Sequence, residues 1–174
     1  KAEWQNVSQQ AYFRINKYEL SEDMHRGESN GILLFSRYRD ENDLYYAGIR
    51  VDGNAVIKKK SDGAYHTLTL RKVLPGVYDR NANPNLLPTD TWIGLRVETE
   101  NLDVQRVLIR LYADVGQTGI WRAVAEAVDD GRFGGPAITE AGHGGIRTDF
   151  MDVDFDTFAV EHLRAPRVST TALK

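Results

Sequence analysis

Short apolar runs separated by turn residues constrain the fold of this chain more than any other feature. Residues 31–39 and 44–51 are rich in aromatic and β-branched side chains, and Asp52-Gly53-Asn54 then provides a hairpin turn into a returning run at 55–60. We expect further strands at 11–20, 65–73, 92–99, 105–113, 121–127 and 150–163, although the Ala-rich run at 123–127 also fits a helical turn. No segment shows the periodicity of a three-turn helix. Many short, regularly spaced strands predict an all-β antiparallel sandwich or jelly roll.

The length and composition limit the organisation and the class of the protein. A chain of 174 residues fits one domain, expected at 1–163, followed by a Pro-containing tail or linker at 164–174. The absence of cysteine excludes disulfide scaffolds, Cys-based zinc sites and thiol nucleophiles. A formal net charge of −3 argues against a general nucleic-acid binder. No apolar run approaches the ~20 residues of a membrane span.

Cationic and aromatic side chains are interleaved between residues 37 and 66. Strand alternation places Lys58 and Lys60 on one face, and Tyr46 and Arg50 on one face. The strands are consecutive, so we expect them to be neighbours in one sheet. Arginine and lysine bind carboxylates, and tyrosine rings stack on sugars, so this patch would suit an acidic glycan. The alternative is a solvated outer face whose lysines protect an edge strand.

Three segments resemble a known fold. They are 31–50, Trp92-Ile93-Gly94-Leu95-Arg96 with the strand at 107–112, and 145–149 running into 154–158. Together they are similar to the concanavalin-A-like jelly roll of laminin-G-like domains, carbohydrate-binding modules and several polysaccharide lyases. The resemblance covers roughly residues 11–163 and implies fold more strongly than function. The chain lacks the paired Glu of retaining β-glucanases, and it lacks the Gln-x-His and Arg-x-Glu-x-Arg motifs of the better-known alginate lyases.

The resemblance and the cationic patch together favour a polysaccharide lyase that acts on a uronate-containing glycan, of the alginate or glucuronan type. β-Elimination needs a cation on the carboxylate, a base for the C5 proton and an acid for the leaving oxygen. The candidate catalytic residues are Lys58, Lys60, Tyr46, Tyr65 and His66. The candidate substrate-binding residues are Arg37, Arg39, Arg50, Arg96 and Trp92.

Three aspartates of the last expected strand form a second candidate site. Asp152, Asp154 and Asp156 share one face of a strand, and carboxylates this close repel one another unless a cation lies among them. The resemblance implies a structural Ca²⁺ here, with Asp156 as the best match and Glu3, or Glu22 and Asp23, as the remote partner. Pairing with Arg147 and simple exposure are the alternatives.

Two further functions stay open beside the lyase. One is a non-catalytic carbohydrate-binding module of a larger secreted enzyme, and the other is a laminin-G-like adhesion domain. The expected partner is an acidic polysaccharide, and the expected location is secreted or periplasmic. The chain begins at Lys1 rather than Met, so we expect a mature, trimmed or excised product.

Overall fold

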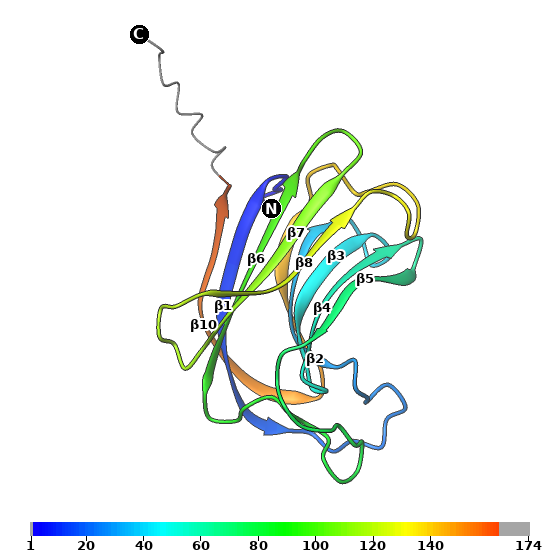
Figure 1. Cartoon of the computed structure of the whole chain (residues 1–174). Coiled ribbons are helices and arrows are strands. Elements are labelled where there is room, and N and C mark those ends of the chain that lie inside the picture. Colours follow the sequence, from blue (N-terminus) through cyan, green and yellow to red (C-terminus); the bar gives the residue numbers. More distant parts are fainter. Residues whose placement is uncertain (1, 164–174) are drawn as a thin grey trace.

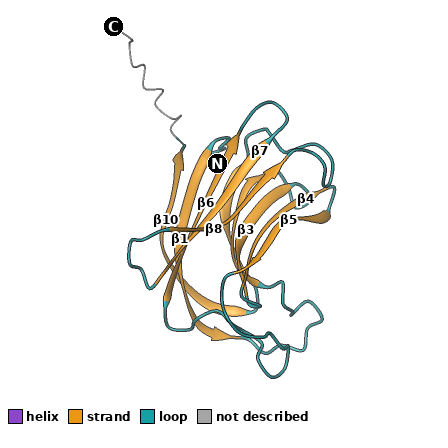
Figure 2. Cartoon of the chain, viewed as in Figure 1, coloured by secondary structure: helices purple, strands orange, loops and turns teal. Residues whose placement is uncertain are grey.

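The computed structural model describes residues 2–163, which form two facing antiparallel sheets without a helix (Figures 1 and 2). The ten strands are β1 (Val7–Tyr18), β2 (Gly31–Tyr38), β3 (Leu44–Arg50), β4 (Asn54–Ser61), β5 (Ala64–Lys72), β6 (Trp92–Asn101), β7 (Val107–Val115), β8 (Arg122–Asp129), β9 (His143–Thr148) and β10 (Met151–His162). The β1 sheet has the order β10-β1-β6-β7-β8, and the β3 sheet has the order β5-β4-β3-β2-β9. The predicted all-β antiparallel sandwich is confirmed. Residues 2–163 include no helix that could cross a membrane.

The strands follow the local signals of the sequence. At the hairpin between β3 and β4, Gly53 has a φ of 77°, and the Asp52 carboxylate accepts the backbone N–H of Asn54 at 3.0 Å. The Ala-rich run at 123–127, which also fitted a helical turn, lies within β8 and pairs with β7. The sheet ladder therefore overrides the helical propensity of alanine at that point.

The core lies between the two sheets. Alternate residues of each strand point inward, so one face of each sheet is apolar and removed from water. The inward set includes Phe13, Ile15, Ile32, Leu34, Tyr45, Ile57, Leu95 and Ile109. A second, smaller apolar cluster lies on the outer face of the β3 sheet, where Leu33, Tyr46 and Val56 pack with Phe35 and Leu44. Outward residues of the β3 sheet are thus partly covered, and they shape the site described below.

Two long loops lie together at one end of the sandwich, at the bottom of Figure 1. They connect β1 to β2 and β5 to β6, and hydrogen bonds join them: Arg26 donates to the Arg80 carbonyl, and Arg80 donates to the Asp23 carbonyl, both at 2.9 Å. The first loop reaches the edge of the outer cluster of the β3 sheet. The tail expected at 164–174 lies outside the described residues.

Candidate functional site

The outer face of the β3 sheet carries the central part of the expected patch. Tyr46 of β3 is directly opposite Lys58 of β4, and Lys60 of β4 is directly opposite Tyr65 of β5. Because opposite residues in an antiparallel pair project from the same face, these four side chains leave the sheet together. The predicted facing of Lys58 and Lys60, and the predicted neighbourhood of these strands, are confirmed.

A pocket of about 320 Å³ lies over this face. Its floor comes from β2, β3, β4 and β5, and β9 contributes Arg147, which is paired with Leu33 of β2. Loop residues close the sides. The full lining is His25, Ser29, Asn30, Leu33, Tyr46, Lys58, Tyr65, Arg147, Asp149 and Phe150. The sandwich thus gathers residues from five strands and two loops around one concavity.

The cations in the pocket, Lys58 and Arg147, and Lys60 beside it lie against aromatic rings. The Lys58 and Lys60 ammonium groups are 5.8 and 4.8 Å from the centre of the Tyr65 ring, and the guanidinium of Arg147 is 5.9 Å from the centre of the Tyr46 ring. The two tyrosine rings meet edge to face, with their centres 5.9 Å apart. Cation–π contacts of this kind orient a charge while leaving its hydrogen-bond donors free. The arrangement presents positive charge and aromatic surface to the same space.

Asp149 supplies the counter-charge of the pocket. Its Oδ1 accepts Nε of Arg147 at 2.9 Å, whereas its buried Oδ2 has no hydrogen-bond partner among the described residues. Burial works against the charge of Arg147, but the charge of Asp149 and its hydrogen bond outweigh this effect and raise the pKa of Arg147. The guanidinium is therefore held in place and charged.

The pKa values of Lys58 and Tyr46, at the centre of the pocket, are shifted from their ordinary values. Burial lowers the pKa of Lys58, and the positive charges of Arg50 and Arg147 lower it further. Burial raises the pKa of Tyr46 to about 12, and Tyr65 and Asp149 add to this effect. Lys58 is thus easier to deprotonate than an ordinary lysine, whereas the Tyr46 hydroxyl keeps its proton throughout the physiological range.

Glycine allows an aromatic ring to cross β9 beside the pocket. A Cβ on Gly145 would lie 2.8 Å from Cε2 of Phe35, so the ring occupies the space that a side chain would need. Phe35 also contacts the Tyr38 ring, with centres 5.4 Å apart. The aromatic surface therefore extends along β2 away from the pocket.

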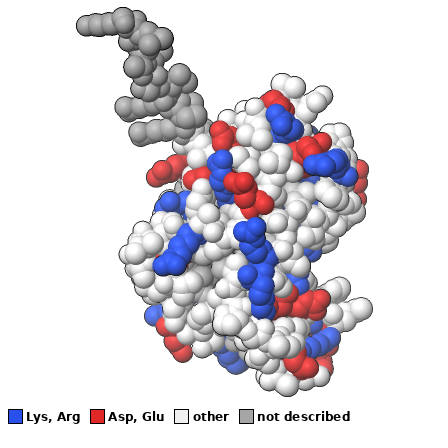
Figure 3. Space-filling model, viewed as in Figure 1, with Lys and Arg blue, Asp and Glu red and all other residues white. Residues whose placement is uncertain are grey.

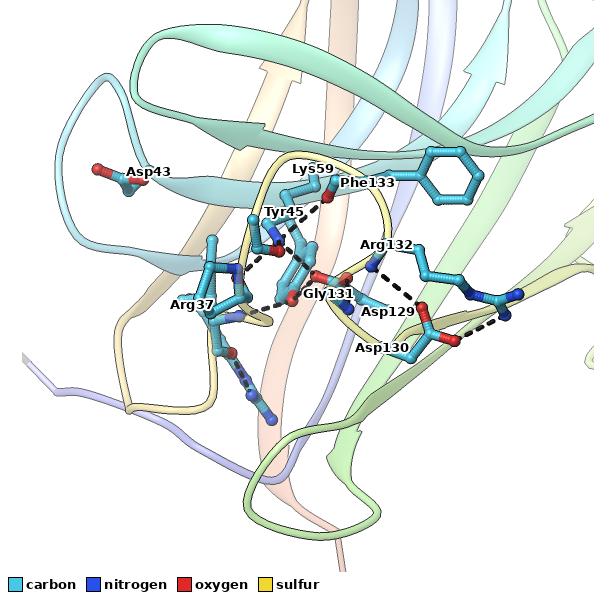
Figure 4. Close-up of polar contacts among 12 residues, drawn as sticks. Arg37, Asp43, Tyr45, Lys59, Asp129, Asp130, Gly131, Arg132 and Phe133 are labelled. Carbon is cyan, nitrogen blue, oxygen red and sulfur yellow. Dashed lines mark hydrogen bonds and ion pairs between the residues drawn. The ribbon is translucent and has the colours of Figure 1, made fainter.

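Lys59, between the two outward lysines, points into the protein and anchors the loop that follows β8 (Figure 4). Its ammonium donates to the carbonyls of Gly135 and Pro136, both at 2.6 Å, and lies 3.0 Å from Oδ2 of Asp129. The Tyr45 hydroxyl donates to the same oxygen at 2.5 Å and accepts the N–H of Ile138 at 2.8 Å. These groups are mutually satisfied, so Lys59 has a structural role.

Arg37 and Arg39 do not reach the pocket, which corrects the expectation that they bind substrate there. Arg37 has a φ of 51° at an irregular step of β2, and its side chain is buried, donating to the carbonyls of Gln5 and Ile138. Burial lowers the pKa of Arg37 to about 10. Arg39 is exposed beyond the end of β2, 3.4 Å from Glu140. The left-handed step at Arg37 breaks the strand alternation that would otherwise place Arg37 and Arg39 on one face of β2.

His66 and Arg50 are also placed differently from expectation. His66 is paired with Lys59 rather than with Lys60, so it lies on the other face of the β3 sheet, and a Cβ on Gly134 would come 2.7 Å from its Nε2. Arg50 shares the outer face with Tyr46 but is nearly buried, donating to Asp52 at 2.8 Å and to the Glu28 carbonyl at 3.0 Å. Arg50 thus influences the pocket through its charge, which acts on both Lys58 and Tyr46.

Arg96 and Trp92 belong to the other sheet. Both lie on β6, where Arg96 donates two hydrogen bonds to Oε1 of Gln10 and its guanidinium lies 4.2 Å from the centre of the Trp121 ring. The guanidinium of Arg14, on β1, lies 5.1 Å from the centre of the Trp92 ring. The expectation that they join Lys58 in one site is corrected, because β6 pairs with β1 and β7 and not with any strand of the β3 sheet.

The three aspartates of β10 are spread along an edge strand. Oδ2 of Asp154 forms an ion pair with Nη2 of Arg14 at 2.5 Å. In the strand ladder, Asp152 lies opposite Lys17 of β1, and Asp156 lies opposite Tyr12. Within residues 2–163, no three His, Asp or Glu side chains converge in a way that could hold a metal ion. The structural calcium stays a prediction. On the face drawn in Figure 3, acidic and basic side chains are interspersed, with no large field of one sign.

Among the lining residues that had not been expected in the site, three carry titratable side chains: Arg147, Asp149 and His25. Arg147 and Asp149 lie about a hundred positions beyond Tyr46 in the chain and arrive through the pairing of β9 with β2. The sequence signal was present only in part, as the run Gly144-Gly145-Ile146-Arg147, whose glycines permit close approach to a neighbouring strand.

Comparison with known proteins supports the fold. No protein-family model and no curated protein matches the sequence. Among solved structures, the carbohydrate-binding module CBM66 from Bacillus subtilis superposes with a TM-score of 0.58 at 16% identity, covering 92% of this chain and 78% of that one. An alginate lyase from Klebsiella pneumoniae covers 90% of this chain and 60% of that one, with a TM-score of 0.38 and 8% identity. With the observed sheet order, the first likeness identifies a concanavalin-A-like jelly roll.

Proposed function

We propose that this chain is a carbohydrate-binding domain whose pocket on the outer face of the β3 sheet takes an acidic saccharide. The observation that carries the proposal is the placement of Arg147 and Lys58 over the rings of Tyr46 and Tyr65 within one pocket. A guanidinium binds a carboxylate through paired N–H donors, and an aromatic ring packs against the C–H groups of a sugar.

The orientation of Arg147 and the exposure of the two tyrosines support the binding of an acidic saccharide. The orientation of Arg147 is fixed by Asp149, so little of its freedom is lost when a ligand binds. Tyr65 is half exposed and can meet a sugar ring, whereas Tyr46 is nearly buried and forms the floor. The fold likeness to a protein named as a carbohydrate-binding module is consistent with the proposal. Such a domain would meet polysaccharides outside the cytoplasm, in a secreted or periplasmic protein.

Calorimetric titration with oligomers of a polyuronate and with a neutral oligosaccharide of equal length tests the proposal. We expect the polyuronate to bind more tightly, and R147Q to weaken it about tenfold, the effect of losing a charge-assisted hydrogen bond. R39Q is the matched control, because Arg39 is exposed and lies outside the pocket. Equal loss in both variants, or no binding of either saccharide, would reject the proposal.

A second candidate function is β-elimination at the same pocket. It is favoured by the opposite pKa shifts of Lys58 and Tyr46. In this reaction Arg147 neutralises the uronate carboxylate, and neutral Lys58 takes the C5 proton. The electron pair forms the C4–C5 double bond, the C4–O bond breaks, and a tyrosine hydroxyl protonates the leaving oxygen. Polyuronate that binds without generating an ultraviolet-absorbing unsaturated product would leave the domain a binding module. A rising absorbance that K58Q abolishes would establish the lyase.

A further inference from the structure

A second pocket, of about 400 Å³, shares no residue with the cation–aromatic site and lies at the seam between the two sheets. It is bounded by the end of β5, by β8 and by the loop that connects β7 to β8. Its walls are aliphatic, formed by Ile49, Val73, Leu74, Ala113 and Val124. Ile49 belongs to the core cluster, and Val73, Leu74 and Val124 pack against that cluster. The pocket therefore opens from the surface toward the main core.

The rim of this pocket exposes apolar surface. Ile120, on the loop after β7, and Val115, the last residue of β7, are 62% and 45% exposed. Exposed aliphatic groups at the mouth of an apolar cavity are typical of ligand sites, because a ligand would remove them from water. The volume of the pocket lies within the range of small-molecule sites.

The loop that carries Ile120 is held in shape by Asp114. Oδ1 of Asp114 accepts the N–H and the hydroxyl of Thr118, at 3.0 and 2.6 Å. Oδ2 accepts the Tyr12 hydroxyl at 2.7 Å and the N–H of Gly119 at 2.8 Å. Each oxygen thus has two donors, and these bonds lower the pKa of Asp114 although burial opposes the shift. This carboxylate is committed to the loop and takes no part in ligand binding.

Arg122 is the cation of the rim. It is exposed, it lines the pocket, and it forms none of the ion pairs found among residues 2–163. The other charged residue of the lining, Asp114, is nearly buried and saturated by donors. The charge that a ligand's polar end would meet at the mouth is consequently positive.

We propose that this seam pocket binds a small amphiphile with an aliphatic body and an anionic head. The body would lie between Val73, Leu74 and Val124, under Ile120, and the head would pair with Arg122. This site is independent of the acidic-saccharide function, because the two pockets share no residue.

Octanoate and octanol are suitable probes, since they share an eight-carbon chain and differ in the head, which is an anionic carboxylate in one and a neutral hydroxyl in the other. The test is calorimetric titration of both into the whole chain, with methyl NMR shifts of Ile120 and Val124 as a second readout. We expect octanoate to bind and to shift both methyl signals. R122Q should weaken octanoate about fivefold, the effect of an exposed ion pair, and leave octanol unchanged. I120S should weaken both probes.

R71Q is the matched control, because Arg71 is another arginine of the same edge that does not line the pocket. It should leave octanoate binding unchanged. Equal loss in R122Q and R71Q would overturn the proposal, since it would indicate diffuse charge attraction. Binding to vesicles of anionic phospholipid without binding of monomeric octanoate would also overturn it, because it would assign the affinity to the surface rather than to the pocket.

Discussion

The ammonium of Lys59 lies 3.0 Å from Oδ2 of Asp129 in the interior, and these side chains are 0% and 1% exposed. The pair joins the inner face of the β3 sheet to the end of β8, the edge strand of the β1 sheet. The Tyr45 hydroxyl donates a hydrogen bond to the same carboxylate. A buried ion pair is no guarantee of high stability, but removing one partner leaves a charge without compensation.

We therefore predict that K59M lowers the free energy of unfolding by about 3–5 kcal/mol. Urea denaturation monitored by tryptophan fluorescence measures the effect. K60M is the control, because Lys60 projects from the outer face, and its cost should stay within about 0.5 kcal/mol. A K59M protein as stable as K60M would show that the pair adds nothing.

Glycine at position 48 lets β2 and β3 approach on the outer face beside the pocket. A Cβ there would lie 2.8 Å from Cα of Leu33 and 2.9 Å from its Cδ2. We predict that G48A costs about 1–3 kcal/mol through overpacking, because backbone cannot move aside as a flexible side chain does. G27A is the matched control, since nothing lies within 4 Å of its added Cβ. Thermal unfolding of both variants measures the difference, and equal melting temperatures would contradict the geometry.

The tyrosine at the floor of the pocket makes stability depend on pH in the alkaline range. Burial raises the pKa of Tyr46 from 10.0 to about 12, so the folded protein holds this proton more tightly than the unfolded chain. The resulting stabilisation is complete below pH 10 and is lost as the pH rises from 10 to about 12. We predict that Y46F is less sensitive than the parent to pH over this window in urea denaturation. Parallel pH profiles would be evidence against a raised pKa.

Asp154 and Arg14 form an ion pair with both side chains largely exposed, at 48% and 41%. We predict that D154N changes the free energy of unfolding by no more than about 1 kcal/mol.

Thermal unfolding in the presence of calcium and in the presence of a chelator tests the predicted calcium site. A melting temperature that rises with calcium in the parent but not in D156N would confirm that site, and identical curves would count against it.

Much of the fold could be predicted, because strand alternation and turns are local properties of the chain. The shared face of Lys58 and Lys60 followed from a period of two, and the same period could have revealed that Lys59, which shares a face with Ile57, points inward. Arg147 could not be assigned to the pocket, because the pairing of β9 with β2 joins distant segments. Nor does alternation specify the sheet to which Arg96 belongs, or the left-handed step that buries Arg37.

The three consecutive lysines of β4 also bear on how faithfully the sheet assembles. A pairing register displaced by one residue would turn Lys58 and Lys60 into the apolar interior and expose Ile57 to water. The observed register brings a single ammonium inward, where Asp129 and the carbonyls of Gly135 and Pro136 receive it. A version of β4 displaced by one residue would instead bury two unpaired charges. The lysine triplet therefore acts against misfolding in a segment that could otherwise slide along β3.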